Sequence, residues 1–349
     1  MAAKLLNLIA LSSLAILACS WGPTATNALS VDTPHNIAAR HHGVIAKKKR
    51  GTTARRCKPR PASLSSAAKP TTTPAPAPAP TTTPKANPAT STKASGGSGT
   101  PSNTGGYNGP PGKVGLAYAG PDDGTISHFI TPKVTAIYNW SPWAPASAAA
   151  LGLEFMPMLW GPKQIGDFTQ LVKPGYAKTV LGFNEPNQSG QSNLDPGYAA
   201  QLWQQYIQPL KNQGYALVTP ACTNAPSGKQ WYQSFFSACT GCTFDIIAVH
   251  YYGTSPQDFI NYITDIHNTF NLDVFVTEFA CQNFGGGAQC SDSDVTNFMD
   301  TVTGFMDSTS WVKKYFAFGL QHDMVGVNPA NQLLASNGYP TALGKDYIN

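Results

Sequence analysis

The sequence predicts an α/β protein whose fold is a (β/α)8 TIM barrel, formed as a single domain after a disordered N-terminal region. Two observations predict this fold. From Lys113 onward, short apolar runs alternate with longer segments in which apolar residues recur at spacings of three and four. Residues 113–349 hold eight such strand-then-helix units, and both the number of units and the length of chain match the barrel.

The strands are expected where the apolar runs lie. They are Val114–Tyr118, Thr135–Tyr138, Glu154–Leu159, Thr179–Phe183, Ala216–Thr219, Ile246–His250, Val274–Thr277 and Tyr315–Phe318. Helical spacing between them is clearest in Tyr198–Gln213, Gln230–Ala238, Gln257–Phe270 and Asp292–Met306. Because proline is favoured at the first position of a helix, Asp195 before Pro196 and Ser255 before Pro256 predict two helix starts.

A doubly wound parallel sheet is the alternative architecture. Such a sheet normally carries a glycine-rich phosphate-binding turn after its first strand, and Gly115-Leu-Ala-Tyr-Ala-Gly120 lacks the further spacing that this turn needs. In a barrel, the carboxyl ends of all the strands share one face, and active sites are built there. The residues that follow the strands are therefore the candidates for a functional site.

The first 112 residues predict targeting and linker segments. Residues 1–28 combine Lys4, a dense apolar run and a small-residue ending at Ala28, which is typical of a secretory signal peptide and too short for a membrane anchor. Residues 29–112 are first basic and then rich in Thr, Pro, Ala and Ser, so they cannot bury enough apolar surface to fold. Lys49-Arg50 is either a dibasic processing site or a solvated patch. We therefore expect a secreted protein, extracellular or associated with the cell wall.

The formal net charge of +5 is a property of the N-terminal region. Residues 1–100 hold 13 Lys and Arg against one acid, Asp32, whereas residues 101–349 hold 10 lysines, no arginine and 17 acids. Bidentate arginine contacts dominate phosphate recognition, so an acidic domain without arginine is a poor candidate for nucleic-acid binding. We expect no nucleic-acid partner, no membrane span and a monomer.

The cysteines predict two local disulfides. Cys281 and Cys290 flank a short loop, and Cys239-Thr-Gly-Cys242 suggests a second bridge in an oxidising compartment. Zinc is the alternative for the second spacing, but no further ligand pair accompanies it, so we expect no metal and no cofactor. Cys222 is left over, either buried and free or paired elsewhere.

Two glutamates stand at the ends of apolar runs, Glu185 in Val180-Leu-Gly-Phe-Asn-Glu-Pro and Glu278 in Val274-Phe-Val-Thr-Glu. Glycoside cleavage requires one carboxylic acid that protonates the leaving oxygen and one carboxylate opposite it. Glu185 and Glu278 follow the fourth and seventh expected strands, so they are expected to face a sugar bound between them. A buried carboxylate that caps a loop amide is the alternative for either residue alone. Asp323, after the eighth strand, is a weaker candidate.

Polar and aromatic residues at the same strand ends predict contacts with a sugar. Asn184, directly before Glu185, has an amide that suits a hydrogen bond to a sugar 2-hydroxyl. Sugar rings present apolar faces that stack on aromatic side chains. His250 is expected to hold the site in place. The other expected substrate contacts are Tyr118, Trp140, Trp160, Tyr251 and Tyr252.

Three motifs together resemble those of glycoside hydrolase family 128, a group of glycosyl hydrolase catalytic cores similar to fungal alkali-sensitive linkage proteins. They are Val180-Leu-Gly-Phe-Asn-Glu-Pro-Asn187, Ile246-Ile-Ala-Val-His-Tyr-Tyr-Gly253 and Val276-Thr-Glu-Phe-Ala-Cys281. The resemblance covers residues 113–349 with the motifs in matching order. Where many relatives read His-Trp-Tyr after the sixth strand, this chain reads His250-Tyr251-Tyr252.

The resemblance implies an endo-β-1,3-glucanase with a (β/α)8 fold that hydrolyses cell-wall β-glucan with retention. By motif, Glu185 would be the acid/base and Glu278 the nucleophile. Two alternatives stay open: a wall-associated glucan-binding or structural protein with little activity, and a hydrolase of another β-linkage. The linkage depends on the curvature of the groove, which the sequence does not specify.

Overall fold

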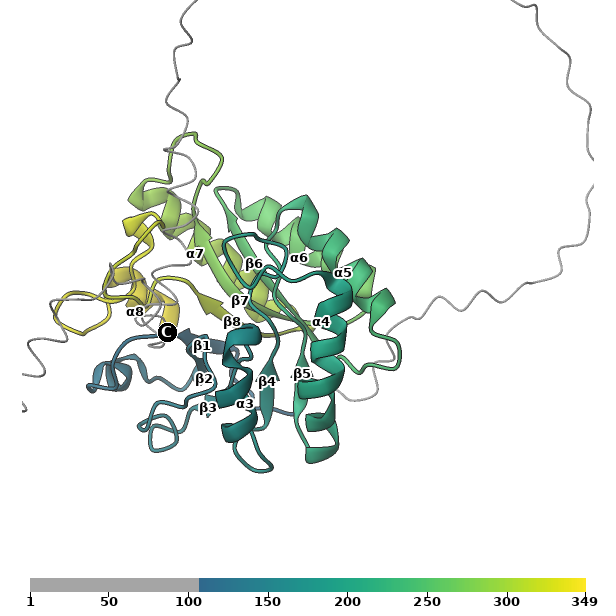
Figure 1. Ribbon diagram of the computed structural model, residues 1–349. Helices are drawn as coiled ribbons and strands as arrows, with labels where there is room; N and C mark the ends of the chain where they lie inside the picture. The colour runs from purple at the N-terminus through teal and green to yellow at the C-terminus, as the bar shows by residue number, and fades with distance from the viewer. Residues whose placement is uncertain (1–106) are drawn as a thin grey trace, which may run out of the picture. The chain divides into compact units, whose positions relative to one another are not determined.

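The strands of the protein form a parallel barrel in the computed structural model, which describes residues 107–349 (Figure 1). The eight strands are hydrogen-bonded in the order β3-β2-β1-β8-β7-β6-β5-β4, and every pair is parallel. A bridge between Met158 and Leu181, beside a 3.1 Å hydrogen bond from Leu159 N to Leu181 O, links the β3 and β4 edges. The predicted (β/α)8 fold is confirmed.

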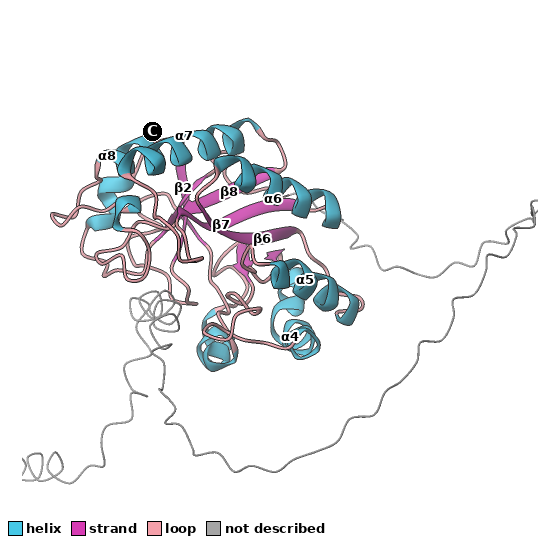
Figure 2. Ribbon diagram, turned by 90° about the horizontal axis from the view of Figure 1, so that it is seen from above, coloured by secondary structure: helices cyan, strands magenta, loops and turns pink. Residues whose placement is uncertain are grey.

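The elements follow one another along the barrel. The strands are β1 (Val114–Ala117), β2 (Val134–Tyr138), β3 (Glu154–Phe155), β4 (Thr179–Leu181), β5 (Ala216–Val218), β6 (Ile246–Gly253), β7 (Asp273–Cys281) and β8 (Val312–Ala317). The α-helices are α3 (Ile165–Leu171), α4 (Pro196–Leu202), α5 (Pro226–Ala238), α6 (Pro256–Phe270), α7 (Asp292–Ser308) and α8 (Ala342–Ile348). Shorter 3-10 and π segments are η1 (Thr125–Phe129), η2 (Pro162–Gln164), η3 (Trp203–Ile207), η4 (Gln208–Gln213) and η5 (Pro329–Asn331). Figure 2 shows the helices on the outside of the strands.

The observed elements differ from the predicted ones where proline intervenes. The strand expected at Glu154–Leu159 ends at Phe155, because Pro157 lacks the N–H that a sheet ladder requires. The helix expected over Tyr198–Gln213 is α4 followed by a π turn and a 3-10 turn that contains Pro209. Between β1 and β3 the described chain forms η1 and turns in place of two α-helices.

Side chains on the two faces of the sheet build two core layers. The outer layer lies between strands and helices and includes Leu116, Val249 and Phe279. The inner layer fills the barrel with alanines and other aliphatic residues and with several aromatic rings, among them Phe275 and Phe316. A Cβ atom at Gly115 would lie 2.0 Å from the Phe316 ring, so glycine there makes room for the ring inside the barrel. Alternation along each strand therefore decides which side chains can reach the barrel interior.

The amino end of the barrel is covered by residues 107–112, which the sequence assigned to the linker. The Tyr107 hydroxyl donates a 2.9 Å hydrogen bond to Glu154, and its ring packs edge-on against Phe275 at 5.1 Å. Lys314 is fully buried and donates to Pro110 O, to Gly112 O and to Thr135 Oγ1. The folded part of the chain therefore begins before Lys113, because these residues close the barrel floor.

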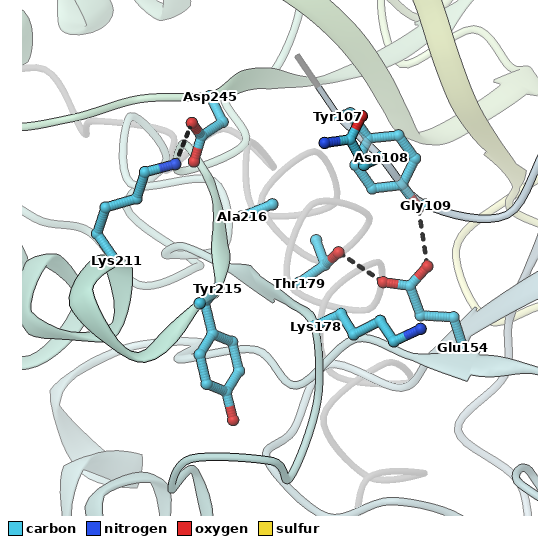
Figure 3. A pocket seen from close by; sticks show the side chains of 11 residues that line it. Tyr107, Asn108, Gly109, Glu154, Lys178, Thr179, Lys211, Tyr215, Ala216 and Asp245 are labelled. Atoms are coloured by element: carbon cyan, nitrogen blue, oxygen red, sulfur yellow. Dashed lines mark hydrogen bonds and ion pairs between the residues drawn. The ribbon is translucent and has the colours of Figure 1, made fainter. Parts of the chain in front are cut away.

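A cavity of about 270 Å³ lies beside this covered end (Figure 3). Its two acidic residues are paired within the protein: Asp245 accepts from Lys211 at 2.6 Å and from Leu217 N at 2.7 Å. Glu154 likewise accepts from Tyr107 and, at 2.6 Å, from Thr179. These hydrogen bonds hold the starts of the strands, and they satisfy Asp245 and Glu154 without a ligand.

Lys314 makes the stability of the fold depend on pH. Burial lowers the pKa of Lys314 from 10.5 to about 8. Between about pH 8 and pH 10.5 the unfolded chain therefore binds more protons than the folded one, so the free energy of unfolding rises with pH in this window. The free energy of unfolding of the wild type should rise by about 1–3 kcal/mol across this pH window, relative to that of Lys314→Met, which cannot titrate at this position. Urea denaturation of both proteins at several pH values measures this, and a constant difference between them would contradict it.

Both predicted disulfides are confirmed, Cys239–Cys242 and Cys281–Cys290, and within residues 107–349 Cys222 is buried and free. The predicted signal peptide at residues 1–28, Lys49-Arg50, Cys57 and most of the predicted linker lie outside the described residues. Among residues 107–349, every helix is too short or too polar to cross a bilayer.

Candidate active site

Glu185 lies at the carboxyl end of the barrel, four residues after β4. Its backbone N–H donates a 2.8 Å hydrogen bond to Ala221 O, which ties it to the end of β5. Its side chain is 1% exposed, and its φ of 40° is in the left-handed region. This conformation is costly for a residue with a Cβ and is concentrated at functional sites.

Glu278 reaches the barrel interior because of a bulge in β7. The β6–β7 register pairs Val249 with Val276 and then His250 with Glu278, so Thr277 is the extra residue. Phe275 is in the inner core layer, whereas Phe279, four residues later, is in the outer one. In a regular strand these two side chains would share a face, so the alternation of inward and outward side chains shifts by one residue between them. Without this change Glu278 would point toward the helices. The sequence placed Glu278 after its strand, whereas it lies within β7.

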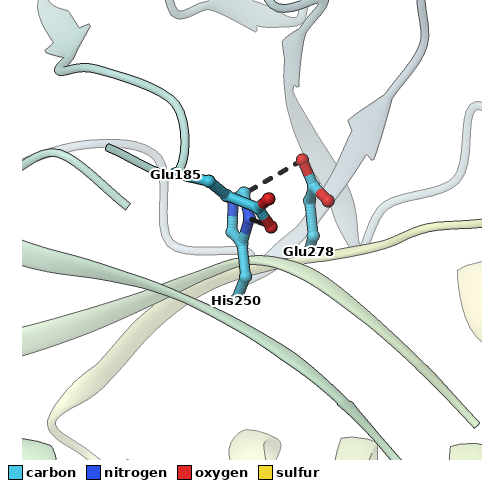
Figure 4. Close-up of side chains that lie close together, drawn as sticks. All are labelled: Glu185, His250 and Glu278. Atoms are coloured by element: carbon cyan, nitrogen blue, oxygen red, sulfur yellow. Dashed lines mark hydrogen bonds and ion pairs between the residues drawn. The ribbon is translucent and has the colours of Figure 1, made fainter. Parts of the chain in front are cut away.

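His250 lies between the two glutamates (Figure 4). Its Nδ1 is 2.9 Å from Glu185 Oε1 and its Nε2 is 3.5 Å from Glu278 Oε1. All three side chains are 0–1% exposed, and an oxygen of each glutamate lies within 4.8 Å of an oxygen of the other. The two predicted carboxylates are thus brought together, with an imidazole that contacts both.

This group is also compact enough to ligate a metal ion, as two carboxylates and an imidazole can. However, each imidazole nitrogen already faces a carboxylate oxygen. The three side chains are thus held in place by contacts with one another.

Each carboxylate oxygen of Glu278 accepts a hydrogen bond. Trp140 Nε1 donates to Oε1 at 2.7 Å and the Tyr252 hydroxyl donates to Oε2 at 2.5 Å. Burial, and then the charges of Glu278 and Glu185, raise the pKa of Tyr252 well above its ordinary value, so its phenol stays protonated. Both donors favour the charged form of Glu278.

Two polar atoms beside Glu185 are buried without a hydrogen-bond partner among residues 107–349. They are Asn184 Oδ1 and Trp160 Nε1. Asn184 N donates to Trp160 O at 3.1 Å, so the two residues are neighbours, and the Asn184 amide also donates to Gln191. Because buried polar atoms are normally paired, one acceptor and one donor here fit the hydroxyls of a bound sugar.

Two residues predicted to contact the substrate, Tyr251 and Tyr118, lie in the outer core layer and not in the barrel interior. Tyr251 belongs to the outer core layer, where its ring packs on Phe259 and Phe298. Its neighbours His250 and Tyr252 point inward, and strand alternation sends Tyr251 to the opposite face. Tyr118 is likewise in the outer layer, and its hydroxyl donates to Pro121 O. The departure from His-Trp-Tyr at Tyr251 therefore lies outside the barrel interior.

Phe284 lies beside the site but is not among the residues that the sequence predicted to be there. It lies on the loop closed by the Cys281–Cys290 disulfide, is partly exposed, and its ring centroid is 5.3 Å from that of Tyr252. The sequence pattern that could have indicated it is an aromatic residue in a short disulfide loop that follows the strand with Glu278. Asp323, the weaker acidic candidate, is exposed and is not part of the glutamate group.

Comparisons with known proteins agree with this geometry. A family model described as "Glycosyl hydrolase catalytic core" matches residues 115–347. Alkali-sensitive linkage protein 1 of Schizosaccharomyces pombe is 31% identical over 242 residues, which are 68% of this chain and 44% of that protein. The chain therefore spans less than half the length of this relative.

Solved structures of glycoside hydrolase family 128 are similar as well. A subgroup V exo-beta-1,3-glucanase from Cryptococcus neoformans has a TM-score of 0.60 and 29% identity, over 68% of this chain and 98% of that one. A subgroup II endo-beta-1,3-glucanase from Sorangium cellulosum has a TM-score of 0.60 and 28% identity, with the same coverage. A subgroup VII oligosaccharide-binding protein from Cryptococcus neoformans has a TM-score of 0.58 and 25% identity, over 71% and 96%.

Proposed function

Because the chain belongs to the glycosyl hydrolase catalytic core family, glycoside hydrolase family 128, we propose that it is a secreted, retaining endo-β-1,3-glucanase of cell-wall β-glucan. The observation that supports this best is the pair Glu185 and Glu278, with oxygens within 4.8 Å of each other. Retaining glycosidases hold their carboxyl groups about 5–5.5 Å apart, whereas inverting ones leave about 6.5–9.5 Å for a water. The short gap favours direct attack by one carboxylate.

In the first step, a Glu278 oxygen forms a bond to the anomeric carbon as the bond from that carbon to the leaving oxygen breaks. Glu185 gives its proton to the leaving oxygen. The donors Trp140 and Tyr252 keep Glu278 charged and oriented for attack. The product of this step is a glycosyl ester on Glu278 and a shortened glucan.

In the second step, Glu185 takes a proton from a water molecule whose oxygen attacks the anomeric carbon. The ester bond breaks, and its electron pair returns to Glu278. Glu185 must therefore change its protonation state twice in each cycle. Its contact with His250 Nδ1 at 2.9 Å holds the carboxyl in one orientation throughout.

The glucan is proposed as substrate because similar structures are named as β-1,3-glucanases, both endo and exo. Asn184 Oδ1 and Trp160 Nε1 supply the unpaired acceptor and donor for its hydroxyls. Secretion is proposed from the signal-like residues 1–28.

Incubating the purified protein with laminarin tests the proposal, and we expect new reducing ends and a ladder of laminarioligosaccharides. Pustulan, cellulose and mannan oligosaccharides serve as controls for linkage. A release of glucose alone would indicate exo action, and cleavage of cellulose or mannan in place of laminarin would refute the linkage. Binding of laminarin without any product would favour an oligosaccharide-binding protein, the function named for the subgroup VII structure.

A further inference from the structure

Trp140 has an unusual backbone for a bulky residue. It lies two residues after β2, and its φ of 57° is in the left-handed region, which is costly for any residue with a Cβ. Its carbonyl oxygen accepts a 3.3 Å hydrogen bond from Gln164 Nε2. On either side, Asn139 donates to Trp143 O at 2.8 Å and Ser141 Oγ donates to Asn139 at 2.9 Å. The surrounding bonds hold a strained conformation, which is typical of a residue placed for function.

The indole ring of Trp140 is enclosed by protein. It is 1% exposed and lies at centroid distances of 4.9 Å from Tyr138 and 5.9 Å from Phe318. A sugar-stacking platform needs an open face, so the predicted stacking role does not fit this position. What the ring presents to the site is its N–H, which points at Glu278 Oε1 at 2.7 Å.

We propose that Trp140 is a positioning residue for the nucleophile, whose indole N–H fixes the orientation of the Glu278 carboxylate and favours its charged form. This inference rests on the proposed function, in which Glu278 attacks the sugar. The indole N–H is a donor that cannot become an acceptor, so it stabilises the carboxylate over the carboxylic acid at every working pH. Together with Tyr252, it gives each Glu278 oxygen a donor from a different strand end.

The side chains that face Glu278 come from three strand ends besides its own. Trp140 follows β2, Tyr138 lies in β2, His250 and Tyr252 lie in β6, and Glu185 follows β4. Trp140 is the one among these five whose side chain is not a titratable group. Its removal therefore changes the charge stabilisation of Glu278 without adding or removing a titrating group.

The Trp140→Phe variant removes the donor and keeps an aromatic ring. We expect the acid limb of the kcat/KM profile on laminarin to move up by about one pH unit, because a hydrogen bond to a charged group is lost. At the optimum, kcat should fall about tenfold or more with KM little changed, because the bond orients the nucleophile and does not touch the sugar. Trp311→Phe, at a ring that stacks on His267 at 4.3 Å, is the matched control.

A direct titration of Glu278 separates this inference from the proposed function. The whole chain contains three glutamates, Glu154, Glu185 and Glu278. Labelling glutamate with ¹³C at the side-chain carboxyl therefore gives three signals, and Glu278→Gln identifies the one that belongs to Glu278. In Trp140→Phe this signal should titrate about one pH unit higher than in the wild type, while the Glu154 signal should not move.

A Glu278 titration that is unchanged in Trp140→Phe would overturn the inference, even if the wild type cleaves laminarin. If the wild type does not cleave laminarin, the proposed function fails, and the titration still decides whether Trp140 acts on Glu278. Should the phenylalanine variant not fold, benzothienylalanine at position 140 keeps the shape of the indole and lacks its N–H. The same upward shift is expected for that protein, and the same unchanged titration would overturn the inference.

Discussion

Glu278→Ala should abolish hydrolysis of laminarin, with kcat/KM lowered by at least about 10⁴-fold. The substitution removes the atom that forms the glycosyl ester, and Tyr252 and Trp140 cannot replace it because both are donors at Glu278. The fold should survive, since the β7 backbone ladder does not use this side chain. A melting temperature within a few degrees of the wild type would show that the loss is chemical.

Glu154→Ala is the matched control for this variant. It removes the one glutamate that lies at the amino end of the barrel, where it accepts hydrogen bonds from Tyr107 and Thr179. The control should keep its activity within a small factor while losing some stability. Near-native hydrolysis by Glu278→Ala would contradict the assignment of the nucleophile.

Glu185→Ala should lower kcat on laminarin by about 10²–10⁴-fold, because the leaving sugar oxygen then departs without a proton. The effect should depend on the leaving group. A 2,4-dinitrophenyl β-laminaribioside needs no protonation, so its first step should stay fast while hydrolysis of the ester becomes slow. A burst of dinitrophenol followed by a slow steady state is the expected trace.

Azide distinguishes the roles of the two glutamates on the same activated substrate. In Glu185→Ala, azide should attack the glycosyl ester and give a β-glycosyl azide. In Glu278→Ala, azide should take the place of the missing carboxylate and give an α-glycosyl azide. Thin-layer chromatography and NMR of the products would reveal the anomers, and exchanged outcomes would reverse the two assignments.

The sequence was sufficient to predict the barrel and the two glutamates. Eight apolar runs appear at the spacing of strand-helix units, and a charged residue at the end of such a run stands out against its neighbours. The two disulfides were predictable for a similar reason, since their short spacings leave few other partners.

The direction of individual side chains was harder to predict. The sixth strand was expected to end at His250, but it continues to Gly253, and its alternation turns Tyr251 outward. The bulge at Thr277 that turns Glu278 inward leaves no mark in the pattern of apolar residues. Trp140 was expected near a sugar because it is aromatic. Its left-handed backbone, however, is supported by a hydrogen bond from Gln164, which lies 24 residues away and leaves no local sequence pattern.

The linker boundary was misplaced for a related reason. Pro110, Pro111 and the glycines around them resemble a continuous linker, yet the carbonyl oxygens of Pro110 and Gly112 accept hydrogen bonds from buried Lys314. Lys314 lies some 200 residues away along the chain, as the separations of 202 and 204 show. Such a long-range polar contact has no local sequence pattern.

The central claim is that Glu185 and Glu278 cleave a β-1,3-glucan through an ester intermediate, and the stereochemistry of the first product tests it most directly. Proton NMR of the laminarin reaction, recorded from the first turnovers, should show the β-anomer of the new reducing end, with the α-anomer growing later by mutarotation. Early appearance of the α-anomer would mean direct attack by water and would contradict the account.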